Sequence, residues 1–330
     1  MSTVTTTSIT YKVPTRRHPV LLFVTQQPLG AGGLIFIVLM ALCAVFAPWV
    51  APYDPLTVDY AAQLAAPSQS HWLGTDSFGR DVASRIIFGA RTALAIGFIA
   101  SFVGSTLGAI IGVVSAYFGG KVDLVIQGIM DVLLSFPIIV LAITVVAILG
   151  NNVVLGIDIN LIIAIALPML PRVERVVRAS ALAIRELPYV DAARAAGYSH
   201  ARIIFRHIVP NVVAPYLIML TAFVAQAILA EASLSFLGLG VTEPTPSWGL
   251  MLSGSAADFY QQAPWMIVFP GIAISLGVFA FNLFGVSSED LERLKTLQRN
   301  YFAEFRRIVA NSEPVEEVVL TNLQILPLAR

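Results

Sequence analysis

Two carboxylates at the edges of long apolar runs are the side chains with the clearest potential for chemistry in this sequence. Asp131 precedes one uncharged run and Glu231 follows another. A charge at membrane depth usually faces the interior of a helix bundle or a watery cavity, where it can line a solute path or a gate. The alternative is that both lie at the level of the lipid headgroups, Asp131 near the inner face and Glu231 near the outer face. Both are therefore candidate pathway or gate residues.

The arrangements of residues that would make the chain an enzyme are not found. There is no GxxxxGK[ST] phosphate-binding loop, so the chain is not expected to hydrolyse ATP by that route. The single cysteine, Cys43, lies in an apolar run and can form neither a disulfide framework nor a Cys-based zinc site. No metal-ligand spacing and no nucleophile with a partner base is present. We predict no catalytic residue, no metal site and no bound cofactor in this chain.

Composition indicates an all-α integral membrane protein. Of the 330 residues, 57% are hydrophobic and 12% are charged, whereas soluble domains carry about 25% charged residues. Basic and acidic residues both number 20, so no strong field favours nucleic acid as a partner. Crossing a bilayer takes about 20 mostly apolar residues. The long uncharged runs are 29–49, 92–116, 132–150, 212–230 and 263–286, and a shorter sixth run covers 159–171.

Six transmembrane helices are therefore predicted, and the charges between them predict their orientation. The first helix is interpreted as a retained signal anchor rather than a cleaved signal peptide. Loops rich in Lys and Arg usually remain in the cytoplasm. Residues 1–28 carry bases and no acid, 172–211 is rich in arginine, and both 151–158 and 236–262 carry acids without a base. We predict that both termini are cytoplasmic and that 50–91 lies on the outer face.

The segment 186–211 has the pattern of two short helices joined by a turn. Pro188 suits a first helical turn, Gly197 suits the left-handed residue after a helix, and Ser199 can cap the next helix. Pro210 is expected to break that second helix before the fifth span. A surface of small side chains, which would let another protein approach the backbone closely, is formed by Ala192, Ala193, Ala195 and Ala196. From physics alone, an amphipathic hairpin lying on the headgroups is an equally good interpretation.

This segment resembles the EAA loop of binding-protein-dependent ABC importer permeases. Within that family the resemblance is to the dipeptide, oligopeptide and nickel branch, and in that branch to the second permease, the C-type subunit. In that family the loop docks in a cleft of a separate ATPase subunit. Asp191 replaces the usual Glu, and His207 stands where an aliphatic residue is common, although the run to Asn211 resembles the RHILPN of peptide transporters. The resemblance assigns ATPase coupling to Asp191, Ala192, Ala193, Gly197, Tyr198, Arg206, His207, Pro210 and Asn211.

Further motifs of the same branch extend the resemblance to about residues 19–285. They include the GTDxxGRD segment, AYFGG at 116–120, DVLLSFP at 131–137, and EASLSFLGLG at 231–240 followed by PSWG. The outer-face motif comprises Gly74, Thr75, Asp76, Gly79, Arg80 and Asp81. Its charged members are expected to form an ion-paired scaffold around a tight turn at Gly74, with direct contact to the solute as the alternative.

A stripe of small residues on the second span predicts close helix packing. Gly104, Gly108 and Gly112 recur at every fourth position, flanked in the same register by Ala100 and Ala116. Such a stripe lets a neighbouring helix approach at backbone distance. We interpret these glycines as packing residues and not as a solute site.

The expected organisation has five parts. A cytoplasmic segment (1–28) precedes the first transmembrane helix (29–49) and the outer-face segment (50–91). A five-helix core (92–285) contains the coupling loop 186–211, and a cytoplasmic tail (286–330) carries an amphipathic helix.

The resemblance implies a permease subunit that imports di- or oligopeptides across the bacterial plasma (inner) membrane. The implied partners are a paralogous permease, two ATPase subunits that bind ATP and Mg, and a periplasmic or lipid-anchored substrate-binding protein. Two alternatives remain open. One is an ion-gradient-driven secondary transporter, and the other is the same ABC class carrying nickel or another non-peptide solute.

Overall fold

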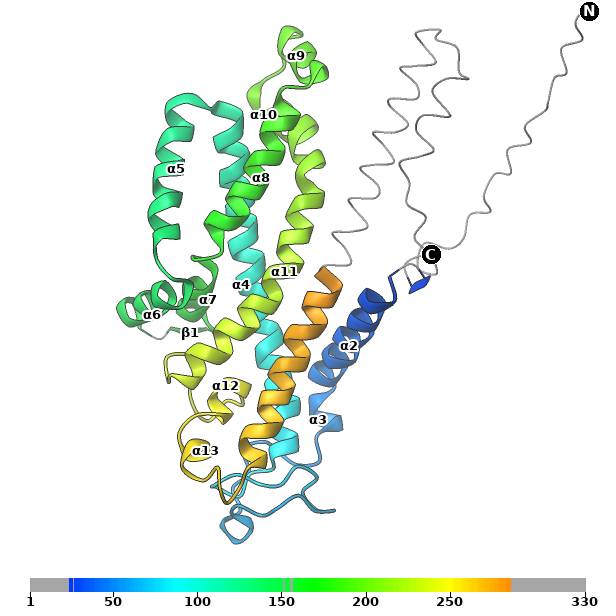
Figure 1. Ribbon diagram of the computed structural model, residues 1–330, viewed down its shortest axis with the longest axis vertical. Coiled ribbons are helices and arrows are strands. Elements are labelled where there is room, and N and C mark those ends of the chain that lie inside the picture. Colours follow the sequence, from blue (N-terminus) through cyan, green and yellow to red (C-terminus); the bar gives the residue numbers. More distant parts are fainter. Residues whose placement is uncertain (1–23, 26, 151, 155–156, 286–330) are drawn as a thin grey trace, which may run out of the picture.

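The computed structural model describes residues 24–25, 27–150, 152–154 and 157–285 (Figure 1). The expectations for most of 1–28 and for the tail 286–330 lie outside the described residues. The long helices are α2 (Pro28–Val45), α4 (Val82–Phe118), α5 (Gly120–Ser135), α6 (Ile138–Leu149), α8 (Leu170–Arg185), α11 (Val209–Phe236) and a helix over Trp265–Gly285.

Short elements connect these helices. They are α3 (Ala47–Val50), η1 (Tyr60–Ala62), α7 (Ile159–Ala166), α9 (Pro188–Ala195), α10 (His200–Ile203), η2 (Ile204–Ile208), α12 (Trp248–Met251) and α13 (Ser255–Asp258). Two strands of two residues each, β1 (Val153–Val154) and β2 (Ile157–Asp158), pair in antiparallel fashion with Val153 opposite Asp158. Apart from this small hairpin, the described elements are helical.

Within the described residues, four helices are long and apolar enough to cross a membrane. They are α2, α4, the continuous helix over His200–Phe236 and the helix over Trp265–Gly285. A fifth candidate is the pair α5 and α6, which are bent by 96° at the break between them. These helices contain the uncharged runs 92–116 and 212–230 in full and most of 29–49, 132–150 and 263–286, which confirms a protein that crosses the membrane several times.

Two of the uncharged runs do not form the single straight helices that the sequence predicts. The run 132–150 is not one straight helix, because Pro137 has no N–H to donate and drives Phe136 to an extended backbone (φ −89°, ψ 136°). The run 159–171 is interrupted after Ala166, and a new helix, α8, begins at Leu170. Because α8 continues to Arg185, the first part of the arginine-rich stretch 172–211 is a helix of the bundle, and the part from 186 onwards forms α9, α10 and the start of the next long helix.

The expected break at Pro210 does not occur. The helix runs from His200 to Phe236 through a π-helical segment, η2, and Pro210 lies in the first turn of α11. The wider π-helical turn accommodates the proline ring, which would clash with a carbonyl in a regular helix. Asn211 Nδ2 donates to the carbonyl of His207 at 2.7 Å. The two short helices therefore lead directly into the membrane-length helix.

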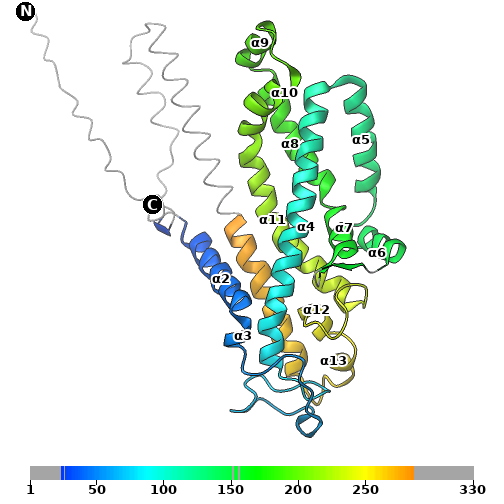
Figure 2. The same cartoon turned by 180° about the vertical axis from the view of Figure 1, so that it is seen from behind.

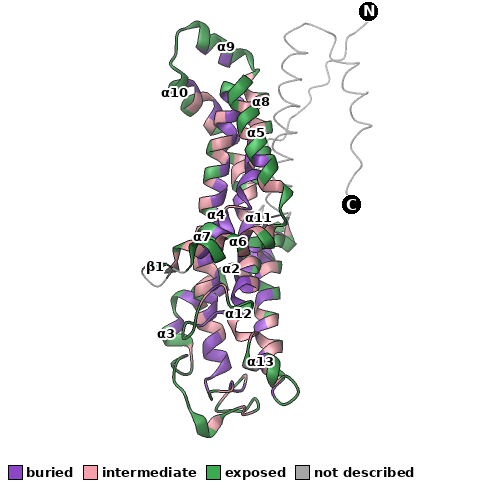
Figure 3. Cartoon of the chain, turned by 90° about the vertical axis from the view of Figure 1, so that its left-hand side faces the viewer, coloured by how far each residue is buried: buried purple, intermediate pink, exposed green. Residues whose placement is uncertain are grey.

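Helix α4 is the centre of the bundle, and α2, α8 and α11 pack against it (Figures 1 and 2). The three glycines of its small-residue stripe contact the backbone of α7 and α8. A Cβ atom at Gly104 would lie 2.8 Å from the carbonyl oxygen of Ala166, one at Gly108 would lie 2.6 Å from that of Leu170, and one at Gly112 would lie 2.7 Å from that of Glu174. Only glycine permits this approach, and buried residues follow the same axis through the molecule (Figure 3).

Candidate functional site

The segment 186–211 forms a compact helical tip at one end of the bundle (Figure 1). Helix α9 ends in a Schellman motif, in which Gly197 N–H donates to Arg194 O at 2.9 Å and Tyr198 N–H donates to Ala193 O at 3.1 Å. Gly197 has the left-handed φ of +75° that this motif requires. The Ser199 side chain then accepts from Arg202 N–H at the start of α10. The tip has a defined backbone path that a headgroup-lying hairpin would not need.

The small-residue surface of this tip is narrower than the sequence indicates. Ala193 is buried, with 6% of its surface exposed, and packs into the main core, whereas Ala192, Ala195 and Ala196 are exposed. The reason is helical periodicity, because Val190 and Ala193 are three residues apart and share the inward face. Asp191 is exposed on the outward face and pairs with Arg194 at 2.9 Å.

Aromatic rings fix the tip to the following helix. The His207 ring lies between those of Tyr189 and Tyr198, with centroid distances of 5.9 and 6.3 Å. Asn211 Nδ2 also donates to the Tyr189 hydroxyl at 3.4 Å. His207 therefore contacts α9 through Tyr189 and the turn before α10 through Tyr198, whereas Arg206 and Pro210 are exposed.

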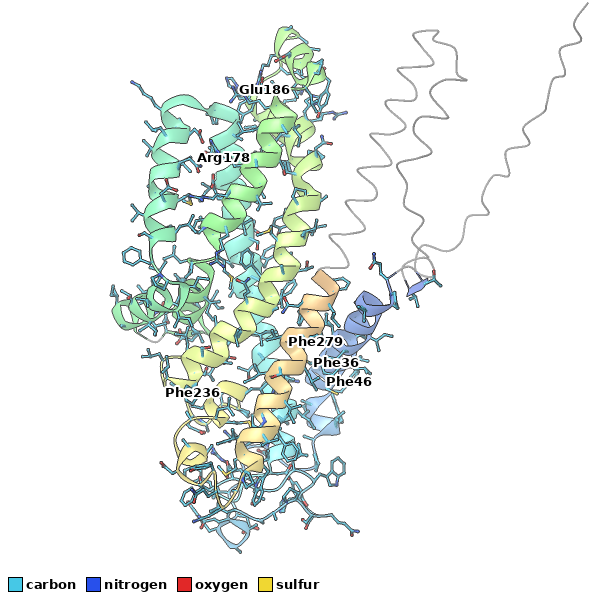
Figure 4. The ribbon with its side chains drawn as sticks, in the orientation of Figure 1. Phe36, Phe46, Arg178, Glu186, Phe236 and Phe279 are labelled. Carbon is cyan, nitrogen blue, oxygen red and sulfur yellow. The ribbon has the colours of Figure 1, made fainter. Side chains whose placement is uncertain are left out.

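The C-terminal end of α4 provides a second support for the tip. The Tyr117 hydroxyl lies 2.7 Å from His200 Nδ1, and Arg185 Nη1 donates to Ala116 O at 2.8 Å. Tyr117 belongs to the AYFGG segment, so this motif holds the tip against the bundle. Glu186 marks the junction of α8 with the tip (Figure 4).

A second polar cluster lies at the opposite end of the molecule, before and after the start of α4. Asp76 Oδ1 accepts from the backbone N–H of Phe78 and of Arg80, and Asp76 Oδ2 accepts from Arg80 Nε at 2.6 Å. Arg80 also donates to both oxygens of Glu243, at 2.8 and 3.3 Å, and Arg85 Nη2 lies 3.5 Å from Glu243 Oε1. This network joins the 50–91 segment to the 236–262 segment.

The charges of this outer network are balanced and mostly buried. Burial alone would lower the pKa of Arg80, but its hydrogen bonds and ion pairs with Glu243 and Asp76 raise that pKa above its ordinary value. Arg85 is 1% exposed. A cavity of about 250 Å³ lies beside these groups, with Leu250 and Met266 contributing to its apolar wall.

The remaining residues of the GTDxxGRD motif shape the backbone around the network. Asp81 caps α4 by accepting from Ser84 N–H at 2.8 Å, and it pairs with His71 rather than with an arginine. Gly74 and Gly79 have φ values of +76° and +74°. A Cβ atom on Gly79 would lie 1.7 Å from Asp59 O. Thr75 is fully buried.

Glu231 is fully buried within the protein near the C-terminal end of α11. Its Oε1 atom accepts from the hydroxyls of Ser235 and Ser247, each at 2.8 Å, while Oε2 has no partner among the described residues. Ser247 caps α12. The carboxylate therefore connects α11 with the outer segment that follows it.

Asp131 is exposed and forms an ion pair with Arg175 of α8. It is one of three polar side chains, spaced four residues apart on α5, that contact α8. Asp123 binds Arg178 with two hydrogen bonds, at 2.7 and 2.6 Å, and Gln127 donates to Glu174 at 2.7 Å. Arg178 lies between the two helices (Figure 4). These contacts hold α5 beside α8.

Sequence reasoning missed three residues of these clusters. Glu243 joins the outer network, Glu174 is a fully buried carboxylate, and Tyr117 supports the tip. For Tyr117 the AYFGG motif itself was a usable signal. For Glu243 no local signal exists, because its partner Arg80 is 163 residues away.

Several membrane-length helices, with an exposed helical tip at one end and an ion-paired segment at the other, define a multi-pass membrane protein. Comparison with known proteins identifies the family. The binding-protein-dependent transport system inner membrane component matches residues 104–290, and the N-terminal TM domain of oligopeptide transport permease C matches residues 25–67.

Two relatives and one solved structure illustrate the similarity. A dipeptide transport system permease protein of Alkalihalophilus pseudofirmus is 42% identical over 80% of this chain and 85% of its own length. A glutathione transport system permease protein of Escherichia coli is 41% identical over 80% and 86%. Among solved structures, an inward facing MetNI methionine ABC transporter aligns at 17% identity and a TM-score of 0.48, covering 64% of this chain and 95% of that one.

The chain belongs to the family of binding-protein-dependent transport system inner membrane components. It is a permease subunit of an ABC importer, and the resemblance drawn from its motifs is confirmed.

Proposed function

We propose that this permease imports di- or oligopeptides. The support is its identity of 41–42% over 80% of its length to permeases named for dipeptide and glutathione transport. Glutathione is itself a small peptide, so both names agree on the chemical class. Nickel and other non-peptide solutes remain the competing cargo within the same class of transporter.

The second part of the proposal is that residues 186–211 receive the force of two separate ATPase subunits, which bind ATP and Mg. The observation that carries it is the structure of the tip. Ala192, Ala195 and Gly197 are exposed on a segment whose backbone is fixed by a Schellman motif and by rings packed on both sides of His207. Small exposed side chains permit close approach by another protein, and the fixed backbone can transmit displacement to α8 and α11.

The third part concerns topology. We propose six spans, in which α5 with α6 and α7 with α8 are two broken ones, with both termini in the cytoplasm of a bacterium and the chain in its inner membrane. The tip is then cytoplasmic, and the outer network around Asp76, Arg80 and Glu243 faces the substrate-binding protein. A paralogous permease completes the solute path. The division into segments 1–28, 29–49, 50–91, 92–285 and 286–330 follows from this topology.

Substitution of Ala192 by Trp tests the coupling surface. Ala192 is exposed in the middle of α9, so the indole should block the approach of the ATPase without disturbing the fold. We expect far less ATPase to copurify with the permease and peptide uptake to be lost in proteoliposomes. Lys121→Trp, at an exposed position in the first turn of α5, is the matched control. Normal copurification and uptake by A192W would refute the assignment.

A further inference from the structure

The face of α8 that points away from α4 carries two arginines. Val173, Val177 and Ala181 on one side of α8 are fully buried against the bundle. Arg172 and Arg175 are exposed on the other side. Helices α5 and α11 lie on the two flanks of this face, and α4 lies behind it (Figures 1 and 2).

These arginines lie deep along the bundle. Gly108 of α4 contacts the α8 backbone at Leu170 and Glu174, on either side of Arg172. Gly108 is close to the middle of the uncharged run 92–116. Asp131, the partner of Arg175, is three helical turns, or about 16 Å, from the start of α5. Charges at such depth face a bundle interior or a watery path, because exposure to lipid is costly.

The partners of the two arginines leave positive charge uncompensated. Arg175 pairs with Asp131, whose side chain is itself 62% exposed. Within the described residues, Arg172 has a single hydrogen bond, from Nη1 to Gln226 Oε1 of α11 at 3.5 Å. A guanidinium has five N–H donors, so Arg172 retains most of its capacity. The neighbouring acid Glu174 points to the opposite side, where it accepts from Gln127.

We propose that Arg172, with Arg175 and Gln226 beside it, binds a carboxylate of the solute halfway across the membrane. A guanidinium and a carboxylate match in shape and can form two parallel hydrogen bonds. The C-terminal carboxylate of a peptide has this chemistry, so the inference rests on the proposed peptide function. It adds a recognition element in the permease, separate from the substrate-binding protein.

The test is uptake of radiolabelled Ala-Ala by the complete transporter in proteoliposomes, with its binding protein at saturation. Loss of a charge-assisted hydrogen bond predicts that Arg172→Gln lowers the maximal rate about tenfold to a hundredfold. Arg172→Lys keeps the charge but not the planar fork, so it should recover only part of the rate and transport faster than R172Q. Lys121→Gln removes an exposed positive charge elsewhere and should transport normally. Uptake of the amide Ala-Ala-NH₂, which lacks the carboxylate, should change less than twofold in R172Q relative to the unmodified protein.

Three results would overturn the inference. They are normal Ala-Ala uptake by R172Q, Ala-Ala uptake by R172K no faster than that by R172Q, and loss of the second permease from purified R172Q complex, which would make this face a subunit contact. Import of neither probe by the unmodified transporter would instead refute the peptide function itself.

Discussion

Replacement of Gly108 by alanine should separate the two most closely packed helices of the bundle. The added Cβ would lie 2.6 Å from Leu170 O and 2.9 Å from Val173 Cβ, whereas ordinary van der Waals contact begins at 3.4 Å. The α8 backbone must therefore retreat by about 0.8 Å at this point. Overpacking of a close contact costs about 1–3 kcal/mol, and because both contacted atoms belong to a rigid helix, we expect about 2 kcal/mol.

The assay is the temperature at which the detergent-solubilised permease loses its fold, measured by size-exclusion chromatography after heating. Gly128→Ala is the matched control, because Gly128 is also helical but a Cβ there meets nothing within 4 Å. That control should gain up to about 1 kcal/mol of stability from the better helix propensity of alanine. Equal stability of the two variants would show that α4 and α8 do not pack at backbone distance.

Two further substitutions test the outer segment with the same assay. Gly79→Ala should prevent the native turn and lower the stability by at least about 2 kcal/mol, because its Cβ would overlap Asp59 O. The control Gly254→Ala, at φ +55° in open space, should lower the stability by only about 1 kcal/mol. Equal losses of stability in the two variants would contradict the clash. Ser247→Ala removes one of the two hydrogen bonds to the buried Glu231 carboxylate and should cost about 1–3 kcal/mol. The control Ser253→Ala loses only a hydrogen bond to a nearby carbonyl and should be close to neutral. An equally small effect of S247A would mean that Glu231 does not hold the outer segment.

Local patterns in the sequence predicted local structure well. The uncharged runs place the membrane-length helices, because burying apolar length is a property of the segment alone. Gly197 and Ser199 have the capping roles that their positions indicate, since caps are made by neighbours in the chain.

Features that depend on direction or on distant partners could not be predicted in this way. Hydropathy does not distinguish a straight helix from one bent by 96° at Phe136–Pro137. The charges of α8 suggested a loop, although polar partners on α5 allow them within the bundle. The salt bridge from Arg80 to Glu243 joins residues 163 positions apart, and sequence spacing carries no information about such a pair.

The π-helical segment Ile204–Ile208 keeps the short helix of the tip continuous with the membrane-length helix. The helix from His200 to Phe236 forms one continuous rod of 37 residues, about 55 Å long at 1.5 Å per residue, in which Pro215 removes one interior backbone hydrogen bond. Near its far end, Glu231 is joined to Ser247 of the outer segment. A tilt applied at one end of this rod must displace the other end at the same time. The molecule can therefore pass a mechanical signal from side to side through a single helix, without relaying it through a chain of separate side-chain contacts.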